Sequence, residues 1–190
     1  MIISILHGTK SGSIPIISGS IGITPELVSV LCRSQHTVLV EGEVNRKEMK
    51  AYLAVGAYII NTKEELLDRG DLIIKKARLE PCDIEYVHGE GKIFFSTIDM
   101  GDRAIVEKAI AHEISLINYK ILPGLEAMKT KKISAAKFSN YIAPFILSLA
   151  GKGLKALVDD EVLRDALLLM RGKAYNGPLA SLHHLQCYEY

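Results

Sequence analysis

The chain has 190 residues, 48% of them hydrophobic and 24% charged, which is typical of a folded globular protein and excludes wholesale disorder. Its 23 lysines and arginines against 22 acidic residues give a formal net charge of +1, which argues against nucleic-acid binding through bulk charge. Three cysteines are too few for a disulfide framework, and the most apolar stretches, 51–60 and 141–150, are about half as long as a bilayer span. We therefore expect a cytoplasmic protein that binds neither nucleic acid nor membrane.

The first two thirds of the chain alternate short strands with short helices. Thr24 followed by Pro25 is typical of a helix start, and Thr62 with Glu65 three residues later matches a capping box. Apolar, β-branched runs without alternation indicate strands that are buried on both faces, as in a parallel sheet. The pattern predicts strands at 2–6, 37–40, 58–60, 71–74, 92–98 and 115–119, and helices from 24, at 46–55, 62–67 and 102–112.

The last third reads as helical. A long apolar stripe predicts a helix at 139–157, a very apolar segment predicts another at 160–170, and a short one is expected at 178–185. We therefore predict an α/β fold with a doubly wound, mostly parallel sheet, flavodoxin- or Rossmann-like, with helices on both faces and C-terminal helices packed on it. Residues 1–190 are expected to form a single domain.

Short sequence motifs give little evidence for a particular binding or metal site. The Gly8–Gly12 loop has the wrong spacing for a phosphate-binding loop and is interpreted as a flexible turn, although its backbone N–H groups could form an anion nest. His183 and Cys187 are four residues apart and could share one helix face as half of a metal site. Without a second ligand pair nearby, surface residues are the favoured interpretation, and we expect no metal.

The order of segments along the chain resembles the alanine dehydrogenase and proton-translocating transhydrogenase family. Residues 22–26, Gly-Ile-Thr-Pro-Glu, are similar to the family's R-V-A-[LI]-T-P, and residues 36–41 are similar to its G-H-x-V-x-V-E. Further matching segments follow in family order at 52–57, 71–75, 91–96, 139–144 and 151–153. The resemblance covers residues 1–121 and 138–190.

In that family the two stretches form one substrate-binding domain, interrupted by an inserted dinucleotide-binding domain. Here only the linker 122–137 joins them, and it is too short for a βαβ nucleotide-binding unit. The resemblance therefore implies a substrate domain without the inserted NAD-binding domain, and we expect no bound cofactor.

The resemblance also implies that the family's reactive groups are replaced. The arginine that binds the substrate carboxylate corresponds to Ser20, and the catalytic histidine corresponds to Asp99. The substrate lysine corresponds to Ala77, or to Leu79 if the alignment slips by two residues to match Glu80-Pro81. These replacements argue against oxidative deamination.

Three hypotheses follow. The first is a non-catalytic or repurposed binding module, a pseudoenzyme that forms homo-oligomers. The apolar segment 163–170 is a candidate for the interface, and packing within the chain is the equally simple alternative. The second is a subunit of an NAD-dependent amino-acid dehydrogenase-like oxidoreductase, completed by a separate nucleotide-binding chain. The third is a site for a small anionic molecule at the strand ends, where open α/β sheets bind ligands; ordinary solvated charges are the alternative there. Its candidate residues are Lys75, Lys76, Arg78 and Asp99.

Overall fold

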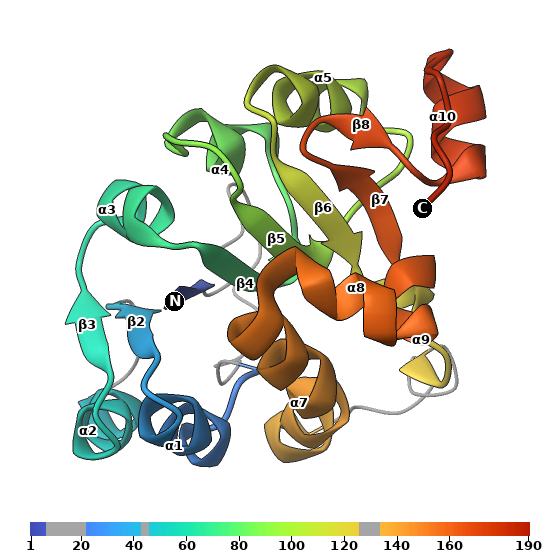
Figure 1. Ribbon diagram of the computed structural model, residues 1–190. Helices are drawn as coiled ribbons and strands as arrows, with labels where there is room; N and C mark the ends of the chain where they lie inside the picture. Colours follow the sequence, from blue (N-terminus) through green and yellow to red (C-terminus); the bar gives the residue numbers. More distant parts are fainter. Residues whose placement is uncertain (7–21, 43–45, 126–133) are drawn as a thin grey trace.

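An eight-stranded sheet forms the centre of the protein, whose computed structural model describes residues 1–6, 22–42, 46–125 and 134–190 (Figure 1). The strand order is β3-β2-β1-β4-β5-β6-β7-β8, with the first six strands parallel and the last two antiparallel. The strands are β1 (Ile2–Leu6), β2 (Thr37–Glu41), β3 (Tyr58–Ile60), β4 (Leu72–Arg78), β5 (Ile93–Thr97), β6 (Ser115–Asn118), β7 (Leu167–Met170) and β8 (Lys173–Ala174). The predicted α/β fold with a mostly parallel sheet is confirmed.

Burial on both faces explains why these strands read as continuous apolar runs. All five residues of β5 are buried, as are four of the five in β1 and in β2. The strand order reverses between β1 and β4, so the chain winds outward in both directions from the middle of the sheet. In such sheets the crevice outside the carboxyl ends of the strands is where ligands bind.

Helices cover both faces of the sheet (Figure 1). One face packs against α1 (Pro25–Arg33), α2 (Arg46–Ala54), α7 (Ala135–Lys152), α8 (Ala156–Asp159) and α9 (Glu161–Asp165). The other face packs against α3 (Lys63–Arg69), α4 (Pro81–Glu85), α5 (Arg103–Ala111) and α10 (Gly177–His183). Two short 3-10 helices complete the described elements, η1 (Tyr119–Ile121) and η2 (Gly153–Lys155). The predicted doubly wound arrangement is therefore confirmed.

The two threonines expected to cap helices lie at the predicted helix starts, but neither caps through its side chain. Thr24 instead contacts α7. Its backbone N–H donates to Ser139 Oγ at 3.1 Å, and the two hydroxyl oxygens are 3.3 Å apart. Thr62 makes no side-chain cap, and Glu65 pairs with Arg69 at 2.7 Å. The capping box predicted at Thr62 is therefore wrong.

The predicted helix at 160–170 is also wrong in its second half. Helix α9 ends at Asp165, and Leu167–Met170 form β7, antiparallel to β6. Arg171 and Gly172 have φ of 49° and 73°, the two successive positive values that a two-residue hairpin turn needs before β8. A run of four apolar residues fits a buried strand as well as a helix, and this turn decides between them.

Helix α7 belongs to the core of the domain. Ile142, Ile146 and Leu149 are fully buried against the sheet, whereas Phe145 is only partly buried. Within the described residues one stretch, Ala135–Asp159, is long and apolar enough to cross a membrane by composition, and a third of its most apolar window is buried inside the protein. Its inward face is thus covered by the protein itself.

Candidate functional site

A hollow of about 1040 Å³ opens at the carboxyl ends of the strands on the β4–β6 side of the sheet. Arg78 ends β4, Thr97 ends β5 and Asn118 ends β6, so three neighbouring strands supply its floor. The loop 98–101 and residues 120–124 form further walls, and Leu182 from α10 lies at its edge. The hollow therefore lies at the strand ends where parallel α/β sheets bind ligands.

Arg78 and Asp99 are the two predicted binding residues that the hollow brings together. Arg78 Nη2 lies 3.1 Å from Asp99 Oδ2 and 3.0 Å from Asp102 Oδ2. Asp99 Oδ1 accepts a hydrogen bond from the Gly101 N–H at 2.9 Å, and Asp102 Oδ1 accepts from the Ile105 N–H at 3.4 Å at the start of α5. Both carboxylates are thus fixed by the backbone, and Arg78 is shared between them.

Asn118 joins the ends of β5 and β6 beneath the hollow. Its Nδ2 donates to the Ile98 carbonyl at 3.0 Å, and its Oδ1 accepts from the Ile98 N–H at 3.4 Å and from the Lys120 N–H at 3.2 Å. The amide is buried, so these bonds persist without competition from water. The same turn exposes the Lys120 side chain to the hollow, and no described residue forms an ion pair with it.

Lys75 does not reach the hollow, contrary to the prediction for the strand end. Its side chain is 2% exposed, and Nζ lies 2.6 Å from Asp83 Oδ2 and 3.5 Å from Glu80 Oε2. Asp83 is fully buried, and its Oδ1 lies 2.5 Å from Lys63 Nζ. Burial alone lowers the pKa of Lys63, but the hydrogen bond and the charge of Asp83 outweigh it and raise the pKa above its usual value. The four residues form an ion-pair cluster in which Lys75 and Asp83 are buried and Lys63 and Glu80 are partly exposed.

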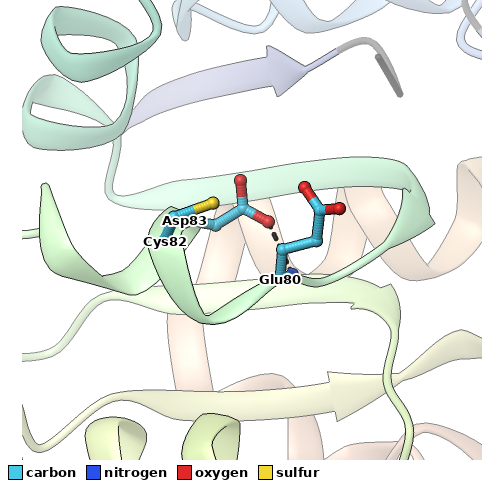
Figure 2. A group of neighbouring side chains, drawn as sticks. All are labelled: Glu80, Cys82 and Asp83. Carbon is cyan, nitrogen blue, oxygen red and sulfur yellow. Dashed lines mark hydrogen bonds between the residues drawn. The ribbon is translucent and has the colours of Figure 1, made fainter. Parts of the chain in front are cut away.

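Asp83 also belongs to the capping box of α4. Its Oδ2 accepts from the Glu80 N–H at 2.7 Å, the bond drawn in Figure 2, and the Glu80 side chain accepts a backbone N–H in return. Glu80, Cys82 and Asp83 offer ligand atoms within 4.8 Å of one another. Both oxygens of Asp83 already face ammonium groups, so a metal ion would have to displace Lys63 and Lys75. We interpret this group as structural.

Lys76 and Ala77 precede Arg78 in β4 but do not line the hollow. Lys76 is exposed and its Nζ lies 5.6 Å from the centre of the Phe138 ring, a cation–π contact with α7. The Ala77 carbonyl accepts from Ser96 Oγ at 3.0 Å, and its methyl group cannot bind an anion. The alternative alignment gives Leu79, which is fully buried. Ser20 and the Gly8–Gly12 loop lie outside the described residues.

His183 and Cys187 do not share a helix face. Helix α10 ends at His183, and His184 follows in the left-handed conformation with φ of 55°. His183 Nε2 lies 2.6 Å from the Met100 carbonyl and so attaches α10 to the loop that lines the hollow. The shared helix face that their spacing suggested is therefore not formed. Sequence reasoning missed Leu182 and Lys120 as residues of the hollow.

Tyr119 directly follows β6, and its burial should make the free energy of unfolding depend on pH in the alkaline range. It is 4% exposed, its ring lies 5.6 Å from that of Phe95 and 5.4 Å from that of Phe138, and its hydroxyl donates to the Lys76 carbonyl. Burial raises the pKa of Tyr119 from 10.0 to about 12. The unfolded chain then loses this proton first, so the stabilisation is complete below pH 10 and disappears as the pH rises toward 12.

Between pH 10 and pH 12 the free energy of unfolding should fall about 2–3 kcal/mol less in the Tyr119→Phe variant than in the unmodified protein. Urea denaturation at a series of pH values measures the difference. Tyr58→Phe is the matched control, because Tyr58 is 62% exposed and the same hydroxyl group is removed from the surface. A pH profile that is equally steep in the Tyr119→Phe variant and the unmodified protein would contradict the assignment.

Comparisons with known proteins agree with this fold. The family model described as "Alanine dehydrogenase/PNT, N-terminal domain" matches residues 19–137, more than half of the chain. A solved structure titled L-alanine dehydrogenase matches with a TM-score of 0.77 at 11% identity over 96% of this chain and 99% of that one. A transhydrogenase from Sinorhizobium meliloti matches with a TM-score of 0.53 at 17% identity over 68% of this chain and 38% of that one. A search of curated proteins finds no match.

Proposed function

Because the chain belongs to the family of the alanine dehydrogenase/PNT N-terminal domain, we propose that it is a stand-alone substrate-type domain that binds a small anionic molecule without catalysis. The observation that carries the proposal is the exposed residue Lys120, which lines the strand-end hollow and forms no ion pair with any described residue. An anion supplies the missing partner, and Arg78 contributes N–H groups beside it.

The residues at the family's reactive positions support a role without hydride transfer. Asp99 stands where the resemblance places the catalytic histidine, and its two oxygens are held by Gly101 and Arg78. Ala77 stands at the position of the substrate lysine and offers only a methyl group. Neither residue supplies the acid–base imidazole or the cation that the family uses.

Titration calorimetry and amide chemical shifts test the proposal together. Acetate and inorganic phosphate should shift amides at 97–101 and 118–124 in a saturable way, and Lys120→Met should weaken this at least about tenfold. NAD and NADH should give no saturable heat, because the linker 122–137 is too short for a βαβ nucleotide-binding unit. Micromolar NADH binding, or no anion binding at all, would refute the proposal.

The alternative is a subunit completed by a separate nucleotide-binding chain. It has one supporting feature: residues 121–124, which begin the segment that leads into the inserted domain in the family, form an accessible wall of the hollow. Under this alternative, alanine-dependent NAD reduction would appear only when such a chain is added. The replaced positions Ala77 and Asp99 weigh against it, because a partner does not restore them.

We further propose that the protein is cytoplasmic and forms a homo-oligomer, most simply a two-fold dimer, since this is the commonest closed symmetry. Several large apolar side chains are exposed away from the hollow, among them Leu53, Tyr58 and Val158. Sedimentation equilibrium should give a mass above the 20.9 kDa of one chain. A single species at the monomer mass over about a hundredfold range of concentration would contradict self-association.

A further inference from the structure

Two large apolar side chains are left exposed on the strand-end hollow. Leu182 is 57% exposed and Ile121 is 37% exposed, and both line the hollow together with the partly buried Met100. Leu182 is held there because its neighbour His183 binds the Met100 carbonyl. These three side chains give the hollow an apolar wall on which Leu182 and Ile121 are exposed in the described part of the protein.

Of the charged residues of the hollow, Arg78 lies on the floor, whereas Asp99 and Lys120 lie in the walls beside the apolar side chains. Arg78 is already shared between Asp99 and Asp102, whereas Lys120 has no acidic partner among the residues described. Lys120 is adjacent to Ile121 in η1, so the unpaired cation and the apolar wall meet in one turn. An ion that only neutralised Lys120 would leave Ile121 and Leu182 uncovered.

The geometry points to an amphipathic organic anion as the ligand, with a carboxylate or phosphate head at Lys120 and an apolar body along Ile121, Met100 and Leu182. This inference rests on the proposed function and adds the chemical class of the ligand. The volume of about 1040 Å³ is at the upper end of the range for sites of drug-sized ligands, so a body of six to eight carbons, roughly, fits. Burying each methylene of that body favours binding.

A homologous series of straight-chain carboxylates tests the inference on the full chain by calorimetry, from acetate through butanoate and hexanoate to octanoate. Affinity should rise about two- to fourfold per added methylene. Octan-1-ol should bind at least about tenfold more weakly than octanoate, because it lacks the charge. Octyl phosphate distinguishes the two head groups, and the chain-length dependence must appear with the head that binds more tightly.

Two variants distinguish the contribution of the ligand's anionic head to binding from that of its apolar body. Leu182→Ser should flatten the rise with chain length and leave acetate binding unchanged, whereas Lys120→Met should weaken every member of the series at least about tenfold. The matched controls are Leu53→Ser and Lys50→Met, exposed residues of α2 that should change neither property. Circular dichroism establishes that each variant is folded.

The outcomes distinguish this inference from the proposed function. Acetate and octanoate binding equally tightly, both sensitive to Lys120→Met, would overturn the amphipathic ligand and leave anion binding intact. Octan-1-ol binding as tightly as octanoate would also overturn it, since the head would then contribute nothing. No binding of any anion, including octanoate, would refute both.

Discussion

Asp83→Asn should lower the free energy of unfolding by about 3–5 kcal/mol, the cost of removing one partner from a buried ion pair. Asparagine keeps the shape but has no charge, so the 2%-exposed Lys75 side chain would keep only Glu80 Oε2, 3.5 Å away, as a counter-ion. Lys63 would lose its only ion-pair partner among the described residues as well. Urea denaturation measures the loss.

Glu65→Gln is the matched control for this substitution. It removes the charge of an exposed ion pair, Glu65 with Arg69 at 2.7 Å, and should cost no more than about 0.5 kcal/mol because solvent screens such pairs. Adding Lys75→Met to Asp83→Asn should recover part of the loss, since the buried ammonium group is then absent. Equal costs for Asp83→Asn and Glu65→Gln would show that the ion-pair cluster is not what stabilises this region.

The same cluster explains how Arg78 is positioned. The register of β4 against β5 shifts between Lys75 and Arg78, so the strand is irregular immediately before the hollow. Lys75 anchors the chain before this irregularity and the Glu80–Asp83 capping box anchors it afterwards. Arg78 lies between two fixed points, which places its guanidinium group between Asp99 and Asp102.

The parallel part of the fold could be predicted because its signals are local. Buried strands contain continuous apolar runs such as 38–40 and 93–95, and Pro25 marks a helix start. The region after 160 could not, since Leu167–Met170 suits either a strand or a helix and only pairing with β6 and the Arg171-Gly172 turn decide. The pairing of this segment with β6 is a contact distant in sequence, which a local pattern does not indicate.

The residues of the hollow also divide into those that the sequence predicted and those that it did not. Arg78 and Asp99 were found because each follows a predicted strand, and strand ends meet at one edge of a parallel sheet. Lys75 was misplaced because nothing local indicates that Asp83, eight residues later, turns back to bury it. Leu182 was missed because a C-terminal helix brings it to the hollow from far along the chain. The position of Lys120 directly after a predicted strand was the signal that could have found it.

Leu167→Glu should unfold the protein. Leu167 is 2% exposed and pairs with Ile117 in β7, between β6 and β8, so a glutamate there would place an unpaired carboxylate in the core. The cost should exceed about 4 kcal/mol, a large part of the 5–15 kcal/mol, roughly, that stabilises a domain of this kind. This burial makes the earlier interpretation of 163–170 as an oligomer interface wrong.

Val158→Glu and Leu167→Glu together decide where that segment belongs. Val158 in α8 is 63% exposed, so its replacement should leave the thermal midpoint almost unchanged. Circular dichroism should show cooperative melting for Val158→Glu and no folded baseline for Leu167→Glu. A folded Leu167→Glu variant that only dissociates in sedimentation experiments would contradict the packing of β7 against β6 and restore this segment as an interface. Otherwise, an interface between copies must use surface outside 167–169, because side chains buried within one chain cannot contact another.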